Sequence, residues 1–113
     1  MILMRQNGNI NQFDVYIVDL DPTLGTEMKK TRPVVIISPA TMNRNLNTVL
    51  IAPLTHSIKG YPSRVKCIFN NEPGEIVLDQ IRGIDKLRLK KKIGNVRKNT
   101  ADDIKSVLAT MFS

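Results

Sequence analysis

The most informative part of the sequence is Asp21-Pro22-Thr23-Leu24-Gly25-Thr26-Glu27, which continues through Thr31-Arg32-Pro33 into the apolar run Val34-Val35-Ile36-Ile37-Ser38-Pro39. An apolar, β-branched segment precedes it, so the pattern predicts two strands joined by a polar loop. The loop brings a carboxylate, Glu27, close in sequence to a permanent cation, Arg32. Loops held by a rigid scaffold often carry catalytic residues. We therefore expect chemistry at this loop.

Short strands follow along the rest of the chain. Apolar and β-branched patterns predict strands over 13–20, 34–38, 48–55, 64–69 and 75–79, and a basic edge strand over 84–89. Residues 70–74 have turn composition, and 39–47 have room for a short helix. Residues 100–112 form an amphipathic helical pattern that Asn99 or Thr100 can cap. These elements predict an α+β fold, a small β-rich single domain whose twisted antiparallel sheet curls into a partial barrel with a C-terminal helix.

Size and composition support one folded domain. A chain of 113 residues at 42% hydrophobic content can bury a modest core. We expect a loose N-terminal leader over 1–12, rich in Asn and Gln, and the folded domain over 13–113. No apolar run approaches the ~20 residues that cross a bilayer. Cys67 is the only cysteine and His56 the only histidine, so we expect a cytoplasmic protein with no internal disulfide, no metal site and no cofactor.

Positive charge is concentrated between Gln80 and Lys98. This segment holds eight of the 17 basic residues and one acidic residue, so it carries +7, which equals the net charge of the whole chain. A localised basic patch favours a polyanionic partner, either a nucleic acid or an acidic protein, over a merely solvated face. Charge alone does not distinguish RNA, DNA and an acidic peptide.

Five ordered blocks resemble the MazF/PemK family of toxin endoribonucleases from type II toxin–antitoxin systems. The blocks are Phe13-Asp14-Val15-Tyr16, Asp21 to Pro39, Ala52-Pro53-Leu54-Thr55, Lys59-Gly60-Tyr61-Pro62 and Asp79 to Lys86. Members of this family are small, homodimeric, metal-independent ribonucleases that cut single-stranded RNA at short sequences. An acidic antitoxin neutralises them. The resemblance therefore implies three partners for this chain: single-stranded RNA, an acidic antitoxin and a second copy of itself.

The resemblance also implies site residues. Glu27, Arg32 and Thr55 match the family's catalytic carboxylate, arginine and threonine. We expect RNA binding by Lys30, His56, Lys59, Asp79 and Gln80. In the PemK branch, an arginine two residues before the aspartate takes part in cleavage. Val77 stands at that position here, which favours the site built on Glu27, Arg32 and Thr55.

Metal-free RNA cleavage uses the 2′-hydroxyl as an internal nucleophile. It requires a base, a cation for the developing phosphoryl charge and a proton for the leaving 5′-oxygen. Glu27 can be the base, Arg32 can hold the phosphate with two N–H groups, and Thr55 can donate one hydrogen bond. The expected products are a 2′,3′-cyclic phosphate and a 5′-hydroxyl. The general acid stays open, because arginine rarely releases a proton and His56 can either protonate the leaving group or only hold the phosphate.

Two other classes of function compete with an RNA-cleaving toxin. One is a toxin of the same fold that binds a protein such as DNA gyrase, as the CcdB group does. That group lacks the Gly-x-Glu and Arg-Pro pair, which this chain has at Gly25 to Glu27 and at Arg32-Pro33. The other is a non-catalytic nucleic-acid-binding module that would use only the basic segment.

Overall fold

The computed structural model of the protein describes residues 10–21 and 30–113. In chain order its elements are β1 (Asp14–Asp21), β2 (Lys30–Ile36), α1 (Ala40–Asn45), β3 (Thr48–Thr55), β4 (Arg64–Phe69), β5 (Glu72–Val77), the 3₁₀ turn η2 (Leu78–Gln80), β6 (Arg82–Asp85), the 3₁₀ turn η3 (Lys86–Arg88), β7 (Leu89–Asn95) and α2 (Lys98–Met111). No described helix is long and apolar enough to cross a membrane.

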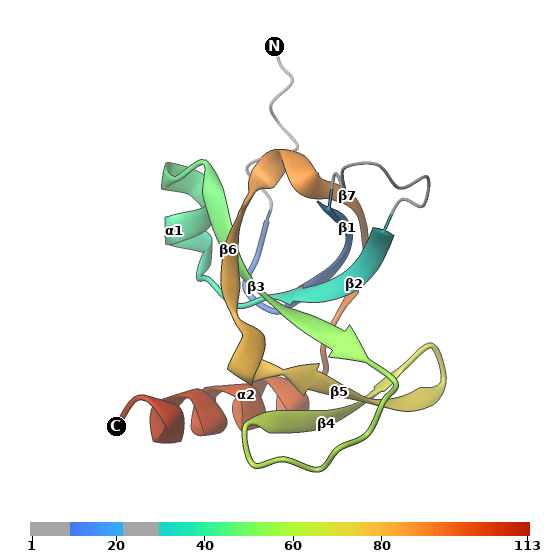
Figure 1. The fold of residues 1–113 in the computed structure, drawn as a ribbon. Coiled ribbons are helices and arrows are strands. Elements are labelled where there is room, and N and C mark those ends of the chain that lie inside the picture. The colour runs from blue at the N-terminus through green and yellow to red at the C-terminus, as the bar shows by residue number, and fades with distance from the viewer. Residues whose placement is uncertain (1–9, 22–29) are drawn as a thin grey trace.

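The strands form one curled antiparallel sheet (Figure 1). Their order is β4-β5-β3-β2-β1-β7, and β6 pairs with β3 outside this path. Strand β3 is central, because its first part pairs with β2 and β6 whereas its end pairs with β5. The helix α2 lies beside β4 and β5 at the bottom of Figure 1. The predicted α+β fold, with a partial barrel and a C-terminal helix, is confirmed.

The sheet buries apolar side chains on both faces. Val34 and Ile36 pack with the apolar cluster that includes Val18, whereas Val35 and Ile37 pack with the cluster that includes Ile104 of α2. Successive side chains of a strand point to opposite faces, so a strand covered on both sides reads as a continuous apolar run. This double burial explains why residues 34–37 do not alternate with polar ones.

The helix α2 docks through one face. Ile104 is fully buried, and Val107 and Leu108 pack around it, as the amphipathic pattern predicts. The helix begins at Lys98 after Arg97, and no side chain caps it, so the predicted cap at Asn99 or Thr100 is wrong. Val96 explains why the helix starts early. Its N–H donates to the Phe13 carbonyl and holds the chain in place just before the helix.

The β4–β5 hairpin is tighter than the sequence pattern suggested. Its turn is Asn70-Asn71, with φ angles of 54° and 62°, and β5 begins at Glu72. Two successive positive φ angles are typical of the two-residue turns that join twisted strands. Pro73 and Gly74 therefore lie inside a strand, and the predicted five-residue turn is wrong. The strand also ends earlier than predicted, since Leu78–Gln80 form η2.

The basic segment is not one edge strand. The predicted strand over 84–89 is wrong, because β6 ends at Asp85 and the chain turns through η3 into β7. The Asp85 carboxylate accepts a hydrogen bond from the Leu87 N–H at 2.8 Å and stabilises this turn. Strand β7, which the sequence did not reveal, pairs with β1 and ends the described sheet on that side.

The folded part begins before residue 13. Ile10 is buried in the apolar cluster around Val18, and its carbonyl accepts a hydrogen bond from the Asn43 amide at 3.0 Å. Gln12 donates to the Ile37 carbonyl at 2.8 Å. Residues 10–12 thus pack with the domain instead of forming the end of a leader. Strand β2 likewise begins at Lys30 rather than at Val34, because residues 30–33 pair with β1.

Candidate active site

Arg32 and Thr55 lie at the rim of the sheet on neighbouring strands. Val34 and Pro53 form the last pair of the β2–β3 ladder toward this rim, and Arg32 and Thr55 each lie two residues beyond it. Residues two apart on a strand share a face, so both side chains belong to the face that carries Val34 and Pro53. The ladder ends at that pair, and Figure 1 shows the two strands separating beyond it. The separation leaves an open end at which Arg32 is exposed and Thr55 partly so.

Two predicted site residues, Glu27 and Lys30, are not fully described by the structure. Glu27, the expected base, lies outside the described residues. Lys30 begins β2 opposite Asp21, and its side chain is also outside the described part. Their roles therefore stay predictions.

The backbone around Thr55 is closely packed against β5. Thr55 pairs with Glu75, and a Cβ at Gly74 would lie 2.8 Å from the Thr55 carbonyl oxygen. Glycine at position 74 permits this close approach. The Thr55 hydroxyl accepts a hydrogen bond from the Ser57 N–H at 3.0 Å. Its own hydrogen stays available, so it can donate to a phosphoryl oxygen.

His56 has a defined orientation although it is exposed. Its Nδ1 lies 2.9 Å from the Pro73 carbonyl oxygen, and its ring stacks on Phe69 at 5.0 Å between centroids. A carbonyl only accepts, so Nδ1 must carry the hydrogen. That tautomer leaves Nε2 to exchange a proton with a bound ligand. The Glu72 carboxylate lies 3.7 Å from Nδ1.

Lys59 lies on the exposed β3–β4 loop (residues 56–63), with its backbone held by Glu75. The Lys59 and Gly60 N–H groups donate to the two oxygens of the Glu75 carboxylate at 3.1 and 2.8 Å. Arg64 approaches the same carboxylate at 3.4 Å. Burial acts to raise the pKa of Glu75, but the hydrogen bonds from Gly60, Lys59 and Arg64 outweigh it and hold that pKa below its usual value.

Asp79 binds within the protein instead of projecting freely. It accepts from the Ser63 hydroxyl at 3.0 Å and from Arg64 Nε at 3.4 Å. Burial acts to raise its pKa, but these two donors and its own backbone N–H lower it. The neighbouring Gln80 is exposed at the end of η2. Of the two, Gln80 is therefore the one free to meet a ligand.

Sequence reasoning missed Glu75 and Arg64. Only 1% of the Glu75 side chain is exposed, and the next residues of the same strand, Ile76 and Val77, are also buried. A carboxylate at the start of the predicted apolar strand over 75–79 was the available signal. Among residues 10–21 and 30–113, no three His, Cys, Asp or Glu side chains gather as a metal site requires.

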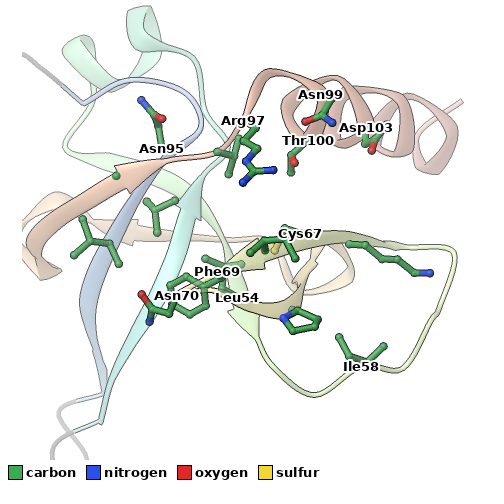
Figure 2. A pocket seen from close by; sticks show the side chains of 18 of the residues that line it. Leu54, Ile58, Cys67, Phe69, Asn70, Asn95, Arg97, Asn99, Thr100 and Asp103 are labelled. Carbon is green, nitrogen blue, oxygen red and sulfur yellow. The ribbon is translucent and has the colours of Figure 1, made fainter.

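A groove of about 870 Å³ adjoins this site (Figure 2). Leu54 and Ile58, which flank Thr55 and His56 in sequence, contribute to its lining. Figure 2 shows Arg97 and Thr100, from the chain entering α2, across the groove from Cys67 and Phe69. The groove therefore combines an apolar floor with a cation on its rim. That combination suits an extended segment with apolar and acidic side chains.

The basic residues spread over β6, η3, β7 and the start of α2. Some of them hold the fold together: Arg88 donates to the Asp19 carbonyl at 3.0 Å, and Lys92 lies 3.4 Å from the buried Asp14 carboxylate. Lys90 and Lys91 are exposed on β7. The positive charge is thus partly structural and partly available to a partner.

Comparisons with known proteins identify relatives of this chain. A family model of PemK-like, MazF-like toxins of type II toxin–antitoxin systems matches residues 11–112. The chain is 40% identical to the endoribonuclease MazF of Staphylococcus epidermidis over 74% of this chain and 75% of that protein. It is 28% identical to the endoribonuclease PemK of Escherichia coli over 98% of this chain and 88% of that protein.

Solved structures show the same architecture. An endoribonuclease in complex with its cognate antitoxin, from a mycobacterial species, has a TM-score of 0.77 and 25% identity, covering 91% of this chain and 94% of that one. A MazE–MazF structure from Deinococcus radiodurans matches in fold with a TM-score of 0.78 at 20% identity, over 91% of this chain and 95% of that one. The curled sheet with a C-terminal helix is the fold that this chain shares with those structures. The chain belongs to the MazF/PemK family of toxin endoribonucleases.

Proposed function

We propose that the protein cuts single-stranded RNA, such as mRNA, without a metal, at the rim where β2 and β3 separate. The observation that carries this proposal is the position of Arg32 and Thr55, each two residues beyond the last β2–β3 pair, next to the loop with His56 and Lys59. Arg32 holds the scissile phosphate and stabilises the charge that builds on its oxygens. Thr55 donates to one of the same oxygens.

Glu27, five positions before Arg32 in sequence, acts as the base that takes the 2′-hydroxyl proton. The 2′-oxygen attacks the phosphorus, the bond to the 5′-oxygen breaks, and a 2′,3′-cyclic phosphate results. We assign protonation of the leaving 5′-oxygen to Nε2 of a His56 imidazolium, because Nδ1 already donates to Pro73. Lys30, Lys59 and Gln80 bind the flanking nucleotides, and Asp79 shapes the loop beside them through Ser63 and Arg64.

Incubation of the purified protein with a long single-stranded RNA in EDTA tests the proposal. We expect cleavage, with 5′-hydroxyl ends and cyclic phosphates identified by end mapping. Loss of cleavage in EDTA with recovery in magnesium would contradict a metal-free mechanism. RNA binding without any cleavage would favour a non-catalytic module, and inertness toward RNA together with capture of gyrase would favour the CcdB-like alternative.

The partners follow from the charge and from exposed apolar side chains. The exposed cations and the groove suit an acidic antitoxin segment that orders on binding and occupies the phosphate sites. Phe112 is 77% exposed, and Ile58, Ile68 and Ile93 are also exposed. A homodimer acting in the cytoplasm would cover part of this surface. Light scattering at micromolar concentration should then give twice the 12.7 kDa chain mass.

A further inference from the structure

We propose that Glu75 is a positioning residue for RNA cleavage, because it holds the Lys59–Gly60 backbone so that Lys59 presents its amine beside Thr55. This inference rests on the proposed function and assigns a role to a residue that contacts neither RNA nor the reacting atoms.

The position of Glu75 connects the loop to the site directly. Glu75 faces Thr55 across the β3–β5 ladder, and the β3–β4 loop starts immediately after Thr55. The loop folds back so that two successive N–H groups, from Lys59 and Gly60, reach the same carboxylate. Gly60 has a φ angle of 72°, which glycine adopts without strain. One side chain thus determines the distance between the end of β3 and the Lys59 backbone.

Three neighbours complete this arrangement, and together with Glu75 they form a loop clamp (Ser63, Arg64, Glu75 and Asp79). Arg64 bridges Glu75 and Asp79, and Ser63 donates to Asp79. The Arg64 guanidinium also lies 4.9 Å from the centre of the Tyr61 ring, so it reaches the loop a second time. The clamp therefore ties both halves of an exposed loop to β5 and η2.

The chemistry of Glu75 fits positioning better than simple filling of space. A buried carboxylate is costly unless several donors satisfy it, and an apolar side chain packs such a site at least as well. Here the donors are backbone N–H groups of the loop, which an apolar side chain would leave unpaired. The negative charge of Glu75 is also partly offset by Arg64, which Asp79 shares.

Hydrogen exchange tests the geometry without RNA. In the native protein the Lys59 and Gly60 amides should exchange slowly for residues in an exposed loop, because both donate to a buried carboxylate. In Glu75→Gln at least one of them should exchange as fast as its unprotected neighbours, while amides of β3 stay protected. Fast exchange of both amides in the native protein would overturn the inference.

A double-mutant cycle tests the functional role. Glu75→Gln and Lys59→Ala should each weaken binding of single-stranded RNA about tenfold, the loss expected for one phosphate contact, and the double variant should be no weaker than Lys59→Ala alone. The KM should rise with little change in kcat. Glu75→Asp, which keeps the charge but shortens the reach, should behave like Glu75→Gln and replaces it if that variant does not fold. Asp102→Asn removes the same charge from the surface of α2 and should leave binding unchanged.

The outcomes separate this inference from the proposed function. If the native protein does not cleave RNA, the proposed function fails whatever Glu75 does. If the native protein cleaves RNA but both Glu75 variants bind like the native protein, the positioning role is refuted and the nuclease stands. Losses that multiply in the double variant would also refute it, because Glu75 would then act independently of Lys59.

Discussion

Around the β3–β4 loop the charged residues of the loop clamp are paired with one another, whereas Lys90 and Lys91 on β7 face solvent. Glu75, Arg64 and Asp79 satisfy one another and the loop backbone at distances of 3.4 Å or less. Lys90 and Lys91 instead extend from a strand that pairs only with β1 in the described sheet. The first region uses charge to determine a backbone conformation, and the second uses it to raise the local positive potential.

The difference shows that the count of charges in a sequence does not reveal what they do. A paired, buried charge acts over a few ångströms and depends on geometry, so removing one partner has a local and specific effect. An exposed charge acts over about a Debye length, ~8 Å at physiological salt, and neighbouring exposed charges are largely interchangeable. Substitutions in the two regions should therefore differ in size, in salt dependence and in additivity.

The largest loss of activity should come from substitutions at the rim where β2 and β3 separate. Arg32→Ala or Glu27→Gln should reduce RNA cleavage at least about 100-fold, because each removes a transition-state contact or the base. Folding should persist for Arg32→Ala, since that side chain is exposed. Single-turnover cleavage of a defined RNA measures the loss. If removing Arg32 costs no more than removing Lys90, the rim is not the catalytic centre.

Replacing the exposed lysines of β7 should change how RNA affinity depends on salt concentration. Replacing Lys90 and Lys91 with Gln should flatten the plot of log RNA affinity against log salt by about 0.7 for each lost phosphate contact. Cleavage of a short substrate at saturating concentration should stay near the native rate. An unchanged slope would mean that these lysines are only solvated, and the contrast with the loop clamp would lose its functional meaning.

Replacing Lys92 should affect stability more than replacing its neighbours on β7. Its amine lies 3.4 Å from Asp14, whose side chain is 4% exposed, so Lys92→Gln leaves a buried carboxylate without its counter-ion. The free energy of unfolding should fall by roughly 1 kcal/mol, because the lysine itself is half exposed. Lys90→Gln is the matched control and should be neutral. Urea unfolding of the two variants measures the difference, and equal stability would place Lys92 with the solvent-facing group.

The smallest expected effect is at Cys67, next to the clamp. Burial, and to a lesser degree the Glu75 charge, raises the pKa of this thiol from 9.0 to about 11. The folded state therefore disfavours the thiolate, and this contribution to stability is full below the unfolded pKa and is lost as pH rises toward 11. Alkylation of the folded protein should be slow at pH 8. Glu75→Gln should lower the thiol pKa and speed alkylation modestly; no change would show that the two groups do not interact.

Strands with strong local patterns could be predicted from sequence. Residues 48–55 and 64–69 are strands with the predicted bounds, because β-branched residues and flanking turn residues agree there. Pro73 misled the prediction of β5, since proline usually marks a turn. In the structure β3 pairs with β5 only at Ile76 and Glu75, so at Pro73 only β4 lies alongside and a missing N–H is tolerated.

Candidate residues could be named from sequence, but their neighbours could not. Arg32, Thr55, His56 and Lys59 stood out through their resemblance to a family motif. The partners that orient them, such as Pro73 for His56 and Glu75 for Lys59, are 16 or 17 positions away along the chain. Only strand register brings such residues together, and register depends on the whole sheet.

The sequence by itself determined the family, the short-strand pattern, the C-terminal helix and the concentration of positive charge, because these depend on local composition and spacing. Tertiary structure alone decided which charges are buried, where β7 lies and how the β3–β4 loop is held. Those features arise from hydrogen bonds and ion pairs between distant segments, as between Glu75 and Gly60 or Lys92 and Asp14. No local pattern encodes such pairs, since their free energy is gained only when the sheet has brought both partners out of water together.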